Sequence, residues 1–198
     1  LVAESGMPAP GLSGVTFESF PEYSYAMRDG RVVFPATLAG QGVDAISRSS
    51  LWIDDGTLVA RGRQAAPGQG DGVIFVNFGL PVPFGDDGLL YTCTFGDGRS
   101  WINSGVCAGP VGSPSIIVRT GDQIEGCPEG TLVGRFDTID RGLPIHVNAS
   151  STVVFPTAQG LVGAKAGFAP FKIARPGDVC EVAGRQRAFQ TCLLYTSR

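Results

Sequence analysis

Short apolar runs alternate with turn residues along the whole chain, and no stretch has the 3.6-residue period of a helix. β-branched and aromatic residues fill the runs, as is typical of strands. Asp29-Gly30 and Asp55-Gly56 lie between successive runs, where a tight hairpin needs residues that tolerate positive φ. The pattern predicts an all-β fold, whose first strands lie near 14–20, 23–27, 31–38, 50–54 and 57–62.

The same pattern recurs about every 57 residues. A Leu-Val-Ala-Glu segment at the start of the chain returns in related form at three later places. Its charged residue gives spacings of 57, 58 and 56 along the series Glu4, Arg61, Arg119 and Arg175. Two longer segments repeat in the same order, because 14–20 matches 72–78 and 31–37 matches 152–158. Several matches in one order at one period identify a tandem repeat.

The repeat divides the chain into units at 1–57, 58–115 and 116–171 and the start of a fourth at 172–191. A unit of this length with about four antiparallel strands has the size of one β-propeller blade, which buries its apolar face against neighbouring blades. Because propellers close with about four to eight blades, we expect a partial, truncated propeller. An open stack of sheets is the alternative. Residues 192–198 resemble the translation of a sequencing adapter rather than an ordinary apolar strand, and we exclude them from the fold prediction.

The second unit leaves its strand register open. Residues 89–93 align with 31–34 in two ways that differ by one residue. A slip of one residue exchanges the inward and outward faces of a strand. The sequence therefore does not predict which way Cys93 points.

The repeat resembles a secreted bacterial tandem-repeat family with an N-x-x-G-x-x-F-like signature, which is found with varied C-terminal surface anchors. The segments that carry the resemblance are 58–68 (LVAREGDPAPG-like), 14–17 (GVTF), 27–34 (hairpin) and 50–52 (SGLW-like). The SGLW-like strand becomes 104–107 in the second unit and roughly 166–168 in the third. The resemblance covers residues 1–175. It implies an extracellular or cell-surface location and a propeller-like fold, and it implies no reaction.

Composition and charge narrow the classes of partner. Glycine supplies 29 of 198 residues, about twice its ordinary share, and the recurring turns account for this excess. The formal net charge of −3 gives no basic field that would attract nucleic acid. No apolar run approaches the ~20 residues of a membrane-spanning helix. We expect an unknown extracellular ligand or protein as partner, with no nucleic acid and no membrane span in this part of the chain.

Cys93 and Cys107 are candidates for a disulfide, because they lie 14 residues apart on predicted neighbouring strands. A disulfide would indicate an oxidising compartment, and two buried free thiols are the alternative. Cys127 and Cys180 are the other cysteines outside the excluded tail. With no C-x-x-C pair and a single histidine, the chain has too few suitably spaced ligands for zinc. We expect no metal and no cofactor.

No catalytic residue is predicted. His146 is a candidate general base, but a hydrogen-bonded position on a strand face is the interpretation that we favour. Neither a nucleophile elbow nor a phosphate-binding loop is present. Turn formation, rather than calcium binding, accounts for the acidic residues at 54–55, 86–87, Asp122 and Asp178.

Four residues are candidates to face a ligand: Trp101, Arg61, Arg119 and Arg175. In a radial fold the arginines would form a ring that binds anionic sugars or carboxylates. The alternative for the arginines is a structural pairing with a neighbouring acidic residue at the strand end. Trp52 lies in a repeated apolar strand, so we expect it in the core.

The predicted function is that of a secreted or cell-surface, noncatalytic scaffold or recognition module. The first alternative is a propeller-type enzyme, a polysaccharide lyase or hydrolase whose site lies partly in further blades. The second is a protein that docks partners on a blade edge. An enzyme would bring several unlike polar residues together at one end of the channel, whereas a scaffold would show repeat-equivalent ones.

Overall fold

The structure is a computed structural model that describes residues 2–21, 26–28, 31–84, 88–136, 145–148, 151–157, 160–182 and 185–188. All the regular secondary structure in this part of the chain is β-strand, which confirms the predicted all-β class. Sheet 1 contains β1 (Val15–Ser19), β2 (Ala26–Arg28), β3 (Arg31–Gly40), β4 (Ser49–Ile53) and β5 (Leu58–Arg61). Sheet 2 contains β6 (Ile74–Phe84), β7 (Gly88–Gly96), β8 (Trp101–Pro110) and β9 (Ser115–Arg119). Sheet 3 contains β10 (His146–Val147), β11 (Val153–Thr157), β12 (Gly160–Ala164) and β13 (Phe171–Ala174).

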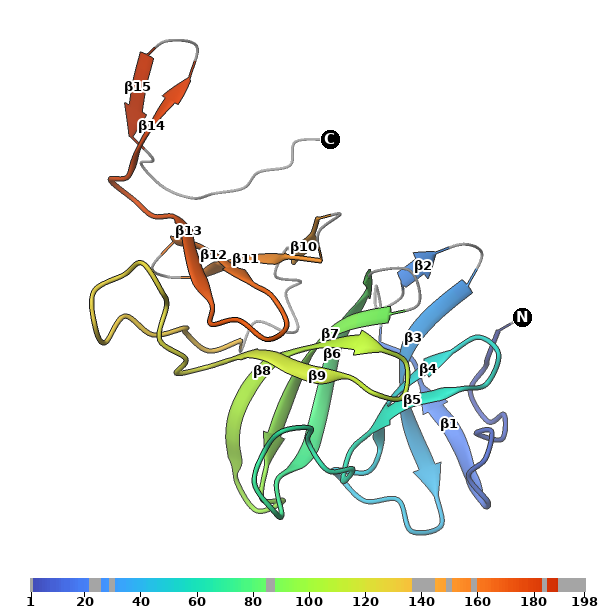
Figure 1. Ribbon diagram of the computed structural model, residues 1–198. Coiled ribbons are helices and arrows are strands. Elements are labelled where there is room, and N and C mark those ends of the chain that lie inside the picture. The colour runs from blue at the N-terminus through green and yellow to red at the C-terminus, as the bar shows by residue number, and fades with distance from the viewer. Residues whose placement is uncertain are drawn as a thin grey trace.

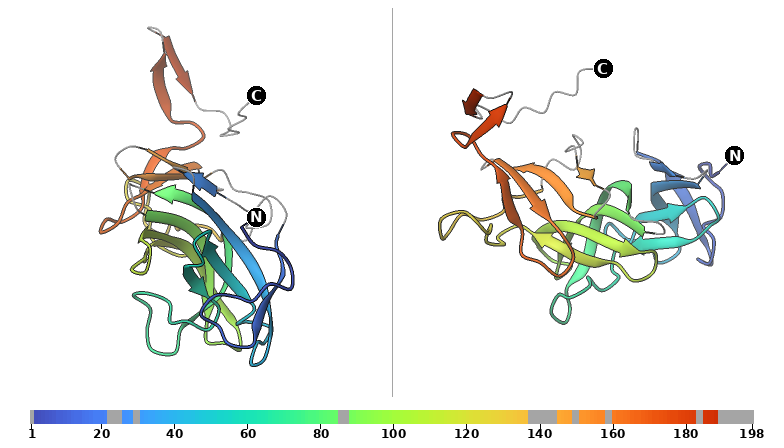
Figure 2. Two further views of the ribbon diagram at one scale, coloured as in Figure 1. Left: turned by 90° about the vertical axis from the view of Figure 1, so that its right-hand side faces the viewer. Right: turned by 45° about the horizontal axis from the view of Figure 1, so that its top comes forward.

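A separate hairpin follows sheet 3, made of β14 (Val179–Val182) and β15 (Arg185–Ala188). Neighbouring strands in each sheet run antiparallel. The sheets follow one another across the molecule in chain order, and the hairpin projects at the end away from sheet 1 (Figures 1 and 2). The described strands close neither a barrel nor a ring of sheets.

A β-bulge at one position fixes the alignment of the three sheets. The strand pairing shifts between Leu51 and Trp52 in sheet 1, between Val106 and Cys107 in sheet 2, and between Leu161 and Val162 in sheet 3. The residue just after each shift lies opposite an aromatic residue, in the pairs Phe34–Trp52, Tyr91–Cys107 and Phe155–Val162.

These pairs settle the register that the sequence leaves open, because they place Tyr91 at the position of Phe34. Cys93, two residues along the same strand, therefore points toward sheet 1. The three aromatic pairs also show that the expected match of residues 166–168 to the SGLW-like strand is wrong. Those residues form the turn between β12 and β13, and Val162 takes the place of Trp52.

The apolar cores lie between the sheets. One core joins Leu51 and Ile53 of sheet 1 to Tyr91 and Phe95 of sheet 2. A second core joins the opposite face of sheet 2 to sheet 3, so sheet 2 is covered on both faces. The remaining face of sheet 1 packs against the segment before β1, with this core formed by Val15, Phe17, Phe34, Ala36, Leu38 and Trp52 together with Ala9. Each sheet thus depends on the element packed against it for burial.

The last strand of each sheet comes from the segment that opens the next sequence unit. β5 hydrogen-bonds to β4 and β9 to β8, although residues 58–61 and the end of 115–119 begin later copies of the repeat. The chain leaves every sheet at this strand and turns toward the following one. The recurring arginines lie at these exits.

Candidate functional site

The recurring arginines end the last strand of sheets 1 and 2 and directly follow that of sheet 3, and each begins the same turn. The main-chain N–H of each arginine donates to the side chain three residues further on, at 2.7 Å for Arg61–Gln64, 2.7 Å for Arg119–Asp122 and 3.0 Å for Arg175–Asp178. The arginine carbonyl accepts the N–H of that same later residue at 3.1, 3.2 and 3.0 Å. Glu4 makes the corresponding turn, since its carbonyl accepts from Met7 at 3.2 Å. The same hydrogen-bonded turn therefore forms at all four positions.

The arginine side chains contact groups in their own neighbourhood. Arg119 Nη2 lies 3.3 Å from Asp122 Oδ1, and Arg175 Nε lies 3.5 Å from Asp178 Oδ1. Arg61 Nε instead donates to the main-chain oxygen of Ser47 at 2.8 Å. Arg119 and Arg175 thus pair with a neighbouring acidic residue at the strand end, as the structural alternative expects, whereas Arg61 binds a main-chain oxygen instead.

Asp178 has further contacts, because Lys172 Nζ lies 3.2 Å from its Oδ2. Partial burial alone would raise the pKa of Asp178. Hydrogen bonds from Lys172 and from the Arg175 main chain outweigh this effect, and the pKa lies below its usual range.

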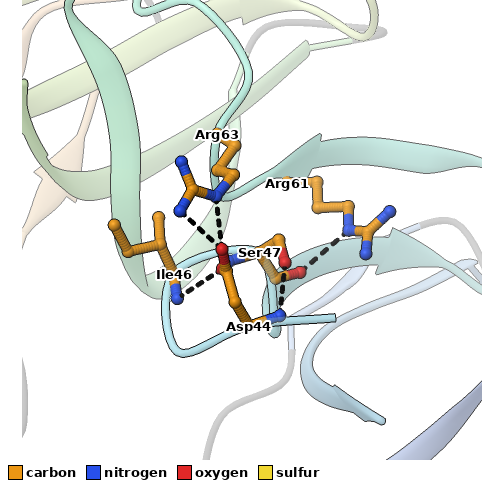
Figure 3. Close-up of polar contacts among 5 residues, drawn as sticks. All are labelled: Asp44, Ile46, Ser47, Arg61 and Arg63. Atoms are coloured by element: carbon orange, nitrogen blue, oxygen red, sulfur yellow. Dashed lines mark hydrogen bonds and ion pairs between the residues drawn. The ribbon is translucent and has the colours of Figure 1, made fainter. Parts of the chain in front are cut away.

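A polar clamp joins the β3–β4 loop to the turn after β5 (Figure 3). Asp44 Oδ1 accepts the main-chain N–H groups of Ile46 and Ser47 at 3.0 and 2.8 Å, while Oδ2 accepts Arg63 Nε at 2.6 Å and Nη2 at 2.5 Å. The hydrogen bond from Arg63 and those from the loop hold the pKa of Asp44 well below its usual range. Gly62 allows the close approach, because a Cβ there would collide with the Ile46 oxygen. The clamp is exposed and both Asp44 carboxylate oxygens already accept hydrogen bonds from the protein, which assigns the clamp to shaping the loop.

A groove lies beside the edge strand β9. It encloses about 280 Å³ and is lined by Pro67, Gly68, Gln69, Ser115, Ile116, Ile117, Arg119 and Asp122. One wall is the turn that follows sheet 1, and the other is β9. Arg119 closes one end, where its Nη1 lies 3.4 Å from Gln69 Oε1. Arg119, one of the four predicted ligand-facing residues, therefore lines this groove.

Cys93 and Cys107 come together in the core between sheets 1 and 2, with their Sγ atoms 3.3 Å apart. In this structure both are free thiols, since an S–S bond is ~2.05 Å long, and the disulfide stays a prediction. Burial, together with the neighbouring Cys107, raises the pKa of Cys93 well above its usual value. Burial and the two cysteines likewise raise the pKa of Tyr91, whose buried hydroxyl has no hydrogen-bond partner among the residues that the structure describes. The raised pKa values keep Cys93 and Tyr91 protonated at neutral pH.

The other candidates are placed as follows. The side chain of Trp101 lies outside the described residues. His146 is exposed on β10, opposite Val154. Trp52 is fully buried, which confirms its prediction as a core residue.

The acidic positions also divide. Asp54 and Asp55 both pair with Arg31, whereas Asp86 and Asp87 lie outside the described residues. Among the described residues, no three His, Cys, Asp or Glu side chains lie close enough to hold a metal ion. The described part of the chain also has no helix long and apolar enough to cross a membrane.

Sequence reasoning missed two features, the groove and the clamp. The clamp joins loops that are 19 residues apart and has no sequence motif. The sequence did contain a signal for the groove. The turns before the three sheets share a buried residue (Ala9, Ala66 or Ile124), and the residue after it is proline in the first two turns but glutamate in the third.

The chain matches a family of unknown function (DUF7453) over residues 1–189. It belongs to that family. Because the match extends over nearly the whole chain, the three sheets and the groove described above lie within the family's region. No curated protein and no solved structure matches the chain.

Proposed function

We propose that this member of the DUF7453 family is a noncatalytic scaffold or recognition module of the cell exterior. The observation that supports this proposal is that equivalent polar groups recur from sheet to sheet and shape the main chain at the strand ends. A catalytic centre needs unlike groups that converge on one point. Similar groups repeated along a series of sheets suit a surface that presents similar contacts to a partner.

We further propose that the three sheets are successive blades of a larger propeller. Three residues occupy equivalent places, two positions before the recurring arginines: Val59, Ile117 and Ile173. Val59 and Ile117 are 9% and 7% exposed because the next sheet covers them, whereas Ile173 is 42% exposed. A further sheet of the same kind packed on sheet 3 would give Ile173 the cover that its two equivalents have.

The resemblance to secreted bacterial repeat proteins supports a location outside the cell. The partner is then an extracellular ligand or protein. An antibody against the chain, applied to fractions of the source organism, tests the location. Detection in the medium or on the surface is expected, and detection only in the cytoplasm would overturn it.

The noncatalytic role is tested by incubating the purified chain with a panel of neutral and acidic polysaccharides. Binding is measured by isothermal titration calorimetry, and turnover by the release of reducing ends and of unsaturated uronates. The proposal expects saturable binding to a surface polymer or protein without product. Product formation above that of a heat-denatured control would overturn it in favour of the lyase or hydrolase.

A further inference from the structure

The turn before β1 and the turns that follow sheets 1 and 2 give three versions of one junction. The same residue of each turn is buried in a core, namely Ala9, Ala66 and Ile124. The residue that follows it faces the edge strand of the next sheet, and it is Pro10, Pro67 or Glu125. What differs between the junctions is how this residue meets that edge.

At sheet 3 the junction is closed by main-chain hydrogen bonds. The Glu125 N–H donates to the Pro170 oxygen at 2.7 Å, and the Lys172 N–H donates to the Glu125 oxygen at 2.9 Å. Glu125 and Phe171 form a parallel β-bridge. The turn thus adds a short extended segment to the edge of sheet 3.

At sheet 1 the junction is closed by a ring contact. A Cβ placed on Gly56, just before β5, would lie 3.1 Å from Pro10 Cγ, so the proline ring lies directly against the chain there. Proline has no N–H and cannot make the bond that Glu125 makes.

At sheet 2 the junction is open. Pro67 also lacks the N–H, and within the described residues no β-bridge joins it to β9. The groove of about 280 Å³ lies between them. Ile116 occupies the position of Lys172, whose N–H is the donor in the closed junction. The edge of sheet 2 is therefore open where the edge of sheet 3 is paired.

We propose that this groove binds an extended peptide segment of another protein, which adds to the edge of β9 by main-chain hydrogen bonds. An unpaired sheet edge is a template for an added strand. The internal precedent is Glu125, an extended residue that pairs with the equivalent edge of sheet 3. The volume is close to the lower end of the ~300–1,000 Å³ typical of ligand sites, which fits a short segment.

The side chains that line the groove make one of its ends polar and one of its walls apolar. Ile116 provides an apolar wall, while Gln69 and the half-exposed guanidinium of Arg119, which is paired with Asp122, provide hydrogen-bond donors at one end. These donors suit a carbonyl or carboxylate of the bound segment. The inference deepens the proposed recognition role and rests on it.

The test uses a phage-displayed heptapeptide library selected on the whole chain, followed by fluorescence anisotropy with the enriched peptides. Pro67→Glu copies the closed junction of sheet 3, so it should close the groove and weaken peptide binding by about tenfold, the loss expected for one or two main-chain hydrogen bonds. Pro67→Ala restores the N–H without adding a charge and should act in the same direction. Pro10→Glu makes the same substitution at the equivalent position of sheet 1 and should leave binding unchanged.

Amide hydrogen exchange of Ile116 provides a second measurement that does not depend on affinity. Exchange should be fast in the free wild-type chain and slow both with bound peptide and in Pro67→Glu. The proposal is overturned if no peptide is selected, or if selected peptides bind Pro67→Glu as well as wild type and leave Ile116 exchange unchanged. Either result leaves the noncatalytic role standing, because that role fails only on turnover.

Discussion

Trp52 and Ser50 form a buried hydrogen-bonded pair whose contribution to stability is measurable. Trp52 is 0% and Ser50 1% exposed. The indole Nε1–H donates to Ser50 Oγ at 2.8 Å, and that hydroxyl donates to the Ala36 oxygen at 2.8 Å. Phe17 lies edge-on against the indole at 5.2 Å between ring centroids. Ser50→Ala removes the centre of this chain without changing the ring packing.

The expected cost follows from the burial. Ser50→Ala leaves the indole N–H without its acceptor, and an unpaired buried donor costs about 1–3 kcal/mol. Trp52→Ala removes the whole ring and should cost about 3–5 kcal/mol, a large part of a typical domain stability of about 5–15 kcal/mol. Trp52→Phe keeps an aromatic ring against Phe17 but has no N–H, so Ser50→Ala made in that background should cost about 1 kcal/mol less than in wild type.

Equilibrium urea unfolding followed by far-UV circular dichroism measures all four members of this cycle, because the signal does not depend on the tryptophan. Ser5→Ala is the matched control, since Ser5 makes a 2.7 Å hydrogen bond to the Glu18 oxygen at an exposed site. Its cost should stay below about 0.5 kcal/mol. Equal costs of Ser50→Ala in the wild-type and Trp52→Phe backgrounds would refute the reasoning.

Three further outcomes are expected. Arg63→Ala should raise the pKa of Asp44 toward its ordinary value, because the Arg63 hydrogen bond is the largest cause that lowers it. Since the folded-state pKa is the depressed one, the Asp44 carboxylate stabilises the fold above about pH 4, and this contribution is lost as the pH falls through the folded value. An NMR titration of the Asp44 carboxyl carbon in both proteins checks the shift, and an unchanged value contradicts it. Cys93 and Cys107 should resist alkylation until the chain unfolds, because both are buried and the raised pKa of Cys93 keeps its thiolate scarce. Mass spectrometry of the digested chain reads the added mass at each cysteine: alkylation of Cys93 or Cys107 in the folded chain contradicts the burial, whereas a need for reductant after unfolding identifies the predicted disulfide. Gly40→Ala should cost more than about 1 kcal/mol in urea unfolding, because its φ is 131° and an added Cβ would collide with a main-chain oxygen, and a smaller cost would show that the turn can relax.

The strands of the first unit could be predicted because their apolar runs are separated by Asp-Gly turns. Residues 31–38 correspond to Arg31–Gly40, and 50–54 to Ser49–Ile53. The register of the second unit could not be predicted, because β7 is buried on both faces, so that even its polar residues Thr92 and Thr94 mark no solvent-facing side. The structure resolves it through the shared bulge, which depends on pairing between strands and leaves no mark on a single strand.

The candidate site was predicted only in part. The arginines could be placed at strand ends from their spacing, and their structural pairing was one of the two interpretations. The groove beside β9 depends on the difference between Pro67 and Glu125, which has a meaning only once both are known to face an edge strand. No spacing in the sequence indicates that residue 67 lies beside residue 116.

The double burial of β7 also has a consequence for how the protein is made. The strand is apolar along most of its length, and its two faces are covered by sheets that precede and follow it in the chain. During synthesis the earlier sheet is ready when β7 emerges, but the later one is not, so one apolar face meets the cytosol or a chaperone first. Each new sheet covers the apolar face that the preceding sheet had left exposed. Chains halted between sheets 2 and 3 are therefore the ones that should aggregate.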